Sequence, residues 1–469
     1  MTLNSRFLII WVACSLVYLA TLAWAEGHGF LSVDATGLWA KSIVQVDGPS
    51  VFKSTEAFYP PLPYVLTMIV QSLSGNQAPP APSLVSAILA GLTVALWYQS
   101  LTRKGGFGAF IAAVAVGILG FNPFFLRAVA DGPGTVLVVL GTWVYARGLV
   151  NLRLSGAAPD MMKVAVGLLL ITVSHTYGLL IAFASMPFIV IAARPSMIAA
   201  SPMGYVLAMF FPVATAIGSL FFVSAIFDST LLPENPDTGV VVSYRQTLAG
   251  LVGFSVVVLV CCLRLIAVPR HSMPLIAAFG TVLGAVFINA NFTAVSDPII
   301  ATAPMISVAV VAARFWPPSR LRGASVGALC LIGAIVSGWS VHTASAVPTV
   351  NWRTAMLGTV VPGRAGTRGT AEFLQTRTDI MTDVERNSEL VAALGRIDDL
   401  VVAGEARYEL ALQSGRPTTR FIVVQHDPDS AAIQDRVLRA FERLFDDRMP
   451  GYHQVYANGN WMVFERNVP

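Results

Sequence analysis

Two acids beside long apolar runs are the strongest candidates for chemistry in this sequence. Asp34 lies nine residues beyond an apolar run over 7–25, and Asp131 lies two residues before Pro133, which opens another run. A carboxylate close to a membrane surface can act as a general base toward a hydroxyl or an amine. The alternatives are a solvated loop acid or helix cap for Asp34, and for Asp131 an N-cap with Pro133 in the first turn.

Three basic residues and one aromatic residue are candidates for substrate binding. Lys53, Arg245 and His175 fall in or beside polar connections, where a cationic or N–H donor suits an anionic phosphate. Ordinary surface charges are the alternative for Lys53 and Arg245, and a helix cap is the alternative for His175. Tyr59 precedes a Pro-Pro-Leu turn that restricts the backbone. It is a candidate for substrate positioning, or else part of a simple loop-to-helix transition.

The composition places these residues in a polytopic α-helical membrane protein. Apolar residues make up 55% of the chain and charged residues 12%, against roughly 25% charged residues in soluble domains. The net charge of +4 lies mostly between apolar runs, which indicates membrane topology and not nucleic-acid binding. Arginine is common and lysine scarce, and with the many Ala and Gly residues this favours a bacterial source. All four cysteines fall in apolar runs, so we expect packed side chains.

About eleven transmembrane helices are expected. We interpret the first run as a retained span with a cytoplasmic N-terminus, since it exceeds a signal-peptide core, and 63–73 as a helix at the outer surface. The other spans are expected near 84–101, 106–121, 133–150, 163–174, 177–193, 203–226, 246–265, 274–290, 298–313 and 323–343. This arrangement places most basic loops inside and the acidic loops outside, as the positive-inside rule requires.

The chain divides into two predicted domains. Residues 1–344 form the transmembrane domain, including a first outer loop over 26–62, and residues 345–469 are polar and charge-rich. Short strands are expected over 400–403 and 420–425, followed by a helix that begins at Asp429 or Ser430 and ends near Phe445. A closing hairpin is expected around Asn458-Gly459. We therefore expect a small extracytoplasmic α/β domain at the C-terminus.

The first outer loop and the topology together resemble the GT-C superfamily of polyprenyl-phosphate-sugar-dependent membrane glycosyltransferases. Protein O-mannosyltransferases and lipid A aminoarabinose transferases share this pattern: a first span, a long outer loop with an early acid, and a Pro-Pro-Leu turn before a juxtamembrane helix. Asp34 matches the loop acid, Tyr59-Pro60-Pro61-Leu62 the turn, and Asp131 the acid between the third and fourth spans. The chain departs from the pattern where Ala35 follows Asp34 and where His175 replaces a lysine.

The resemblance implies an enzyme of the inner membrane and cell envelope. It would move a hexosyl or pentosyl group from a polyprenyl phosphate to a lipid, polysaccharide or protein acceptor, with inversion. Asp34 would deprotonate the acceptor, Asp131 would orient the acceptor or assist Asp34, and Lys53, Arg245 or His175 would hold the leaving phosphate. No cofactor is required by the sequence, and a divalent metal is compatible with the resemblance.

Two other classes remain open from the sequence. A polysaccharide or lipid transporter or polymerase component should show polar residues deep in its spans or broken-helix pairs, and the sequence predicts neither. A non-catalytic membrane scaffold would not need Asp34, Asp131 and the basic residues to converge. The distances among those groups therefore bear on the choice between an enzyme and a scaffold.

Overall fold

The computed structural model describes most of the apolar part of the chain and short stretches of the rest. The described residues are 5–27, 32, 34–35, 38–39, 42, 60–74, 80–227, 244–266, 268–293, 296–343, 352, 356, 400–402, 421–425, 452–457 and 461–466.

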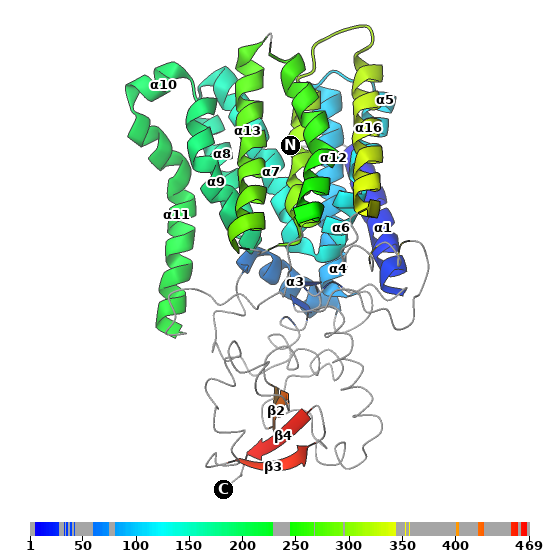
Figure 1. Ribbon diagram of the computed structural model, residues 1–469, viewed down its shortest axis with the longest axis vertical. Helices are drawn as coiled ribbons and strands as arrows, with labels where there is room; N and C mark the ends of the chain where they lie inside the picture. Colours follow the sequence, from blue (N-terminus) through cyan, green and yellow to red (C-terminus); the bar gives the residue numbers. More distant parts are fainter. Residues whose placement is uncertain are drawn as a thin grey trace.

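Helices account for nearly all of the apolar part, and they run side by side in a bundle (Figure 1). The first half contains α1 (Ser5–Gly27), α3 (Pro61–Ser74), α4 (Ala81–Gln99) with its π-helical extension η2 (Ser100–Lys104), α5 (Ala109–Gly120), α6 (Pro123–Asp131) and α7 (Pro133–Ser155). The second half contains α8 (Ala158–Thr172), α9 (Thr176–Ala192), α10 (Pro195–Ala200), α11 (Pro202–Phe227), α12 (Tyr244–Arg264), α13 (Pro269–Ile288) with η3 (Asn289–Thr293), α14 (Pro298–Thr302), α15 (Pro304–Arg314) and α16 (Arg322–Thr343).

The protein is a helical membrane protein. Within the described residues, five helical segments are long and apolar enough to cross a bilayer, and they lie at 5–25, 81–104, 133–155, 202–222 and 270–292. A sixth is obtained if α5 and α6 form one bent span. A crossing takes about 20 apolar residues, so the shorter apolar helices need local thinning of the bilayer or shielding by neighbours to do the same.

Every span expected from the sequence coincides with a helix or a helix pair, because the apolar runs and their Pro and Gly punctuation set the helix ends. The count of eleven spans stays a prediction. Two elements were not expected, α6 and α10. The expectation of no broken-helix pair was wrong, since α5 and α6 form a pair bent by 59°.

The bend between α5 and α6 has a local cause. The Asn122 side chain accepts a hydrogen bond from the backbone N–H of Phe124 at 3.0 Å, and Pro123 occupies the first turn. Both are strong signals for a new helix start. The Tyr18 hydroxyl of α1 donates to the Gly120 carbonyl at 2.7 Å, so the last turn of α5 remains hydrogen-bonded where the axis changes direction.

Helix α7 forms the centre of the bundle and is buried along most of its length. Its register against its neighbours is fixed by two buried polar contacts. The Ser307 hydroxyl of α15 donates to the Val139 carbonyl at 2.6 Å, and the hydroxyls of Tyr145 and Thr281 lie 3.1 Å apart. In a membrane such contacts help to set how helices align, since lipid offers no competing partner.

Helix α3 crosses one end of the bundle, the end where α6 also lies, whereas α10 lies at the opposite end (Figure 1). The Leu62 N–H donates to the Val173 carbonyl at 3.1 Å, which joins the start of α3 to the end of α8. Trp39 of the first loop donates from its indole N–H to the Gln71 side chain at 3.0 Å. Trp39 is thus held against α3 at this end of the molecule.

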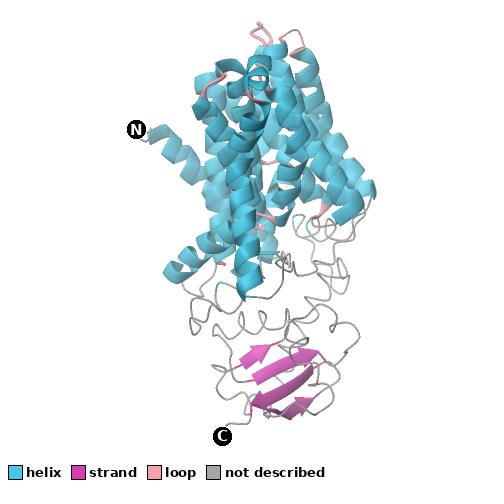
Figure 2. Cartoon of the chain, turned by 90° about the vertical axis from the view of Figure 1, so that its left-hand side faces the viewer, coloured by secondary structure: helices cyan, strands magenta, loops and turns pink. Residues whose placement is uncertain are grey.

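Four strands near the C-terminus form one sheet, drawn in magenta in Figure 2. They are β1 (Leu400–Val402), β2 (Phe421–Gln425), β3 (Tyr452–Ala457) and β4 (Trp461–Arg466), in the order β1-β2-β4-β3. The β1–β2 pair is parallel, and β3 and β4 form an antiparallel pair with an irregularity between Gln454 and Tyr456. The expected strands and hairpin are confirmed, whereas the helix expected from 429 to 445 lies outside the described residues.

Candidate active site

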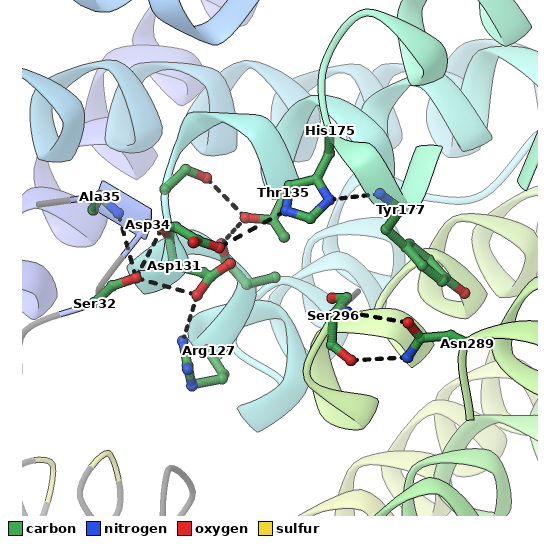
Figure 3. A network of polar contacts seen from close by, with 12 residues as sticks. Ser32, Asp34, Ala35, Arg127, Asp131, Thr135, His175, Tyr177, Asn289 and Ser296 are labelled. Atoms are coloured by element: carbon green, nitrogen blue, oxygen red, sulfur yellow. Dashed lines mark hydrogen bonds and ion pairs between the residues drawn. The ribbon is translucent and has the colours of Figure 1, made fainter. Parts of the chain in front are cut away.

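Three side chains from separate parts of the chain meet at the end of the bundle that α3 covers. They are Asp34 of the first loop, Asp131 at the end of α6, and His175 at the start of α9 (Figure 3). One ligand atom from each lies within 4.8 Å of the others. We call these three residues the acidic cluster, and the end of the bundle that carries it the acidic end.

Asp131 is buried and held by two neighbours. Its Oδ1 lies 3.2 Å from Nη1 of Arg127, one helical turn earlier, and this ion pair is also buried. The Ser32 hydroxyl lies 3.0 Å from the Asp131 carbonyl and 3.2 Å from its Oδ1. The interpretation of Asp131 as the cap of α7 was wrong, because the N-cap is Gly132 and no side chain caps the helix.

Gly132 produces the sharp change of direction between α6 and α7. Its φ of 138° and ψ of 177° lie in a region that essentially only glycine adopts. The Thr135 hydroxyl is placed to donate to the carbonyls of Ala128 and Gly132, each at 2.9 Å, so the turn is tied to both helices. This turn points the Asp131 carboxylate back toward the first loop.

Asp34 is the accessible member of the cluster, with 46% of its side chain exposed against 7% for Asp131. It lies in a short helical turn with Ala35, whose N–H donates to the Ser32 hydroxyl at 3.5 Å. Ser32 therefore connects the backbone beside Asp34 to the buried Asp131. A molecule approaching from solvent would reach Asp34 before Asp131.

His175 is the N-cap of α9, which confirms the capping interpretation. Its Nδ1 accepts a hydrogen bond from the Tyr177 N–H at 3.0 Å, and its Nε2 lies 3.8 Å from Asp34 Oδ2. A neutral imidazole whose Nδ1 is an acceptor carries its proton on Nε2. His175 therefore presents an N–H toward Asp34. The buried Tyr177 hydroxyl donates to the Ala301 carbonyl at 2.9 Å and anchors the start of the helix.

A glycine allows His175 to come this close. A Cβ added to Gly134, in the first turn of α7, would lie 2.7 Å from the Ser174 carbonyl oxygen and 3.4 Å from the His175 ring. Backbone atoms cannot approach a Cβ so closely, so any larger residue would push the 174–175 turn away from α7.

Burial and the neighbouring acid raise the pKa of Asp131 to about 6. Burial is the larger cause, since it disfavours the charged form, and the Asp34 charge adds to it. Arg127 and His175 act in the opposite direction, and Asp297 raises the pKa further. The Asp131 carboxyl therefore changes its charge close to the pH range in which an enzyme works, as catalytic acids and bases often do.

A divalent metal does not fit His175 as the site is arranged. Nδ1 is occupied by the Tyr177 N–H, so an Nε2 lone pair for a metal would require a doubly deprotonated ring. The two carboxylates remain, and Asp131 already faces the Arg127 guanidinium. The observed contacts instead suit a proton-transfer site in which the His175 N–H faces Asp34 across 3.8 Å.

The positions of the other predicted site residues relative to the acidic cluster are outside what the structure describes. Lys53 and Tyr59 lie outside the described residues. Arg245 lies in the first turn of α12, and its side chain is outside the description.

Three residues around the acidic cluster were not predicted from the sequence. Arg127 had a signal, since it stands four residues before an acid on one helix face and is basic where the other loops are acidic. Asp297, buried and close enough to Asp131 to affect its charge, was expected only as a loop acid. Ser32 had no signal, because its role depends on how the first loop folds onto α6.

No protein-family model matches the chain, and no curated protein matches it. The fold and the site define a helical membrane protein with a preorganised cluster of two carboxylates and one imidazole at one end of its helical bundle.

Proposed function

We propose that the protein is a membrane glycosyltransferase of the GT-C type, using a sugar carried on a polyprenyl phosphate. The main support is that Asp34, Asp131 and His175 come together from three separate segments of the chain. A scaffold gives no reason for an accessible carboxylate to lie beside a buried one with a raised pKa. The resemblance of the first loop supports the same class of enzyme.

In the proposed reaction Asp34 is the general base. It takes the proton of an acceptor hydroxyl or amine while the acceptor atom bonds to the anomeric carbon. The bond from that carbon to the phosphate oxygen breaks, and polyprenyl phosphate leaves with the electron pair, so the anomeric configuration inverts. Arg127 and Ser32 keep Asp131 in place beside Asp34, where it orients the acceptor. The His175 N–H, Lys53 or Arg245 holds the leaving phosphate.

We place the acidic end on the extracytoplasmic side of the inner membrane, with the N-terminus cytoplasmic, about eleven spans, and residues 345–469 as an outer α/β domain. Basic residues at the opposite end of the bundle support this orientation, since cytoplasmic loops collect Arg and Lys. They include Arg153 at the end of α7, Arg194 beside α10 and Arg314 at the end of α15.

The test is transfer from a panel of radiolabelled polyprenyl-phosphate sugars in membranes. Asp34→Asn should lower the rate by about 10²–10⁴-fold, the usual contribution of a general base. Asp160→Asn makes the same chemical change at the opposite end of the bundle and should leave transfer nearly unchanged. Equal transfer by wild type and Asp34→Asn would remove Asp34 from the mechanism, and no transfer by wild type from any donor would contradict the proposal.

A transporter is the second candidate, and the bent α5–α6 pair favours it, because broken helices often form transport sites. Reconstituted vesicles that move a polyprenyl-linked sugar across the bilayer without forming a new glycosidic bond would support a transporter. Formation of a glycosylated acceptor in detergent solution, where there is no second compartment, would exclude transport as the sole activity.

A further inference from the structure

Three arginines meet near the end of the bundle opposite the acidic cluster. Arg147 lies on α7, Arg314 ends α15 and Arg322 begins α16. The contact between Ser307 and Val139 fixes α7 against α15, and Arg314 and Arg147 follow it by about two helical turns on each helix. The positive charges of Arg147 and Arg314 lie close enough to repel each other. We call these three residues the arginine cluster.

The guanidinium groups of the cluster are packed against aromatic rings. Arg322 lies 4.2 Å from the centre of the Phe107 ring, and its Nη2 donates to the Arg314 carbonyl at 3.2 Å. Arg314 itself lies 4.7 Å from the centre of the Phe315 ring. Stacking of this kind orients a guanidinium and leaves its in-plane N–H groups free to bind an anion.

Several donors of the cluster are buried without a hydrogen-bond partner among the described residues. They are Nε and Nη1 of Arg314, Nε of Arg147 and Nε of Arg322. Arg314 is the most buried of the three, at 8% exposure. Most buried polar groups have a partner, so several orphaned donors on adjacent arginines require an explanation.

Neighbouring arginines show that this end of the bundle can satisfy a guanidinium when the fold requires it. Arg153 donates to the Ala193 carbonyl, and Arg194 donates to the Arg153 carbonyl at 2.7 Å. Asp160, whose charge acts on Arg147, already accepts from Lys163 at 2.6 Å and from Ser155. Protein carbonyls thus accept hydrogen bonds from Arg153 and Arg194, whereas several donors of the arginine cluster have no acceptor among the described residues.

We infer that the arginine cluster of Arg147, Arg314 and Arg322 is a binding site for a phosphate group. A phosphate oxyanion can accept from several planar guanidinium groups at once and cancels their mutual repulsion. The group can belong to the headgroup of an anionic phospholipid, which basic pockets between membrane helices bind, or to a soluble phosphate. This inference is independent of the proposed glycosyl transfer.

The test measures thermal unfolding of the full-length protein in nanodiscs. One arm adds inorganic phosphate to discs of phosphatidylcholine, against sodium chloride of equal ionic strength. The other arm replaces part of the phosphatidylcholine with phosphatidylglycerol in phosphate-free buffer. At least one arm should raise the melting temperature of the wild type saturably, by about 2 °C or more.

Arg314→Gln should weaken the apparent affinity roughly tenfold or more, as loss of charged hydrogen bonds does. It should also melt at a higher temperature than wild type without an anion, since an unpaired buried charge is removed. When the anion is present, wild type should melt at a higher temperature than Arg314→Gln. A purely structural arginine would give a variant less stable in both conditions. Arg320→Gln, an exposed position between Arg314 and Arg322, is the matched control and should behave like wild type.

The two arms separate the sources of the phosphate. A shift with phosphatidylglycerol alone indicates a lipid headgroup, and a shift with inorganic phosphate indicates a soluble anion. No wild-type shift in either arm overturns the inference, and so does an equal shift in wild type and Arg314→Gln. If Arg314→Gln does not fold, Arg147→Gln makes the same comparison.

Discussion

Buried charges have different partners at the acidic end and at the opposite end of the bundle. At the acidic end the Asp131 carboxylate is paired with Arg127 and accompanied by the Ser32 hydroxyl, while the adjacent Asp34 faces solvent. At the opposite end Arg147 and Arg314 carry the same charge and keep buried donors without a protein partner in the described part of the chain.

The difference separates two kinds of site. A cluster whose internal contacts are satisfied is preorganised, and its geometry does not depend on a ligand. A cluster with unsatisfied buried donors is completed by something that binds to it. The comparison therefore predicts that substitutions at the acidic end change structure and chemistry directly. Substitutions at the arginine cluster should raise stability when no anion is bound and lower it when the anion is present.

The largest expected effect comes from breaking the Arg127–Asp131 ion pair. Asp131→Ala leaves the Arg127 guanidinium buried without its carboxylate and should cost about 3–5 kcal/mol of unfolding free energy. The double variant Arg127→Met with Asp131→Leu should recover most of that stability, because two apolar side chains of similar size replace the pair. Thermal or denaturant unfolding of both variants tests this. A single variant as stable as wild type would show that the pair is not structurally important.

The next largest effect is a pH dependence of folding stability that arises from Asp131. Its folded pKa of about 6 lies above the ordinary value of 3.8 for an aspartate carboxyl, so the folded state binds more protons than the unfolded state between these two pH values. The stabilising contribution is complete below about pH 4 and is lost as the pH rises through about 6, by up to about 3 kcal/mol. Asp131→Asn should flatten this dependence. The prediction would be contradicted if the free energy of unfolding changed with pH in the same way for wild type and variant over pH 4–7.

Substitution of Gly134 should have an intermediate effect that appears mainly in activity. Gly134→Ala places a methyl group against the Ser174 carbonyl and displaces His175 from Asp34. A shift of about 1 Å near a reacting group can cost about 10²-fold in rate. Transfer kinetics measure the loss, and Gly327→Ala, at a position where an added Cβ meets no neighbour within 4 Å, is the control. Unchanged transfer by Gly134→Ala would show that the position of His175 does not matter.

The smallest effect is expected from Asp160 in the first turn of α8. Burial opposes its ionisation, but the hydrogen bonds from Lys163 and Ser155 outweigh burial and lower the pKa of its carboxyl. Because Lys163 is largely exposed, Asp160→Asn should cost only about 0.2–1 kcal/mol at neutral pH. The contribution is present above pH 4 and disappears as the pH falls through the lowered pKa. A loss above 2 kcal/mol in unfolding experiments would mean that Asp160 also stabilises Arg147.

Much of the helical fold was predictable, because apolar runs between Pro and Gly residues determine where membrane helices begin and end. Pro133 and Pro202, for example, each open a helix near the expected position. The 400–402 and 421–425 strands and the closing hairpin were also predicted from local pattern.

The assembly of both clusters was not predictable from local pattern. Asp34 and His175 are 141 positions apart in the sequence, and their approach to 3.8 Å depends on the packing of separate segments of the chain. The arginine cluster depends on the register of α7 against α15, which a single contact at Ser307 fixes. The sequence did mark Asp34, Asp131 and His175 as candidates by residue type, but among the contacts of either site only the spacing of Arg127 and Asp131 along one helix could be read from it directly.

The backbone conformation of Gly132 has a consequence for sequence variation. Its φ of 138° lies where residues with a Cβ are strained, whatever space surrounds them. In a saturation-mutagenesis map the column for position 132 should be depleted in all nineteen replacements. The column for Asp131 should keep some polar residues under selection for folding alone. Such a map would distinguish a residue required by the path of the chain from a residue required by its chemistry, although the two are adjacent in the sequence.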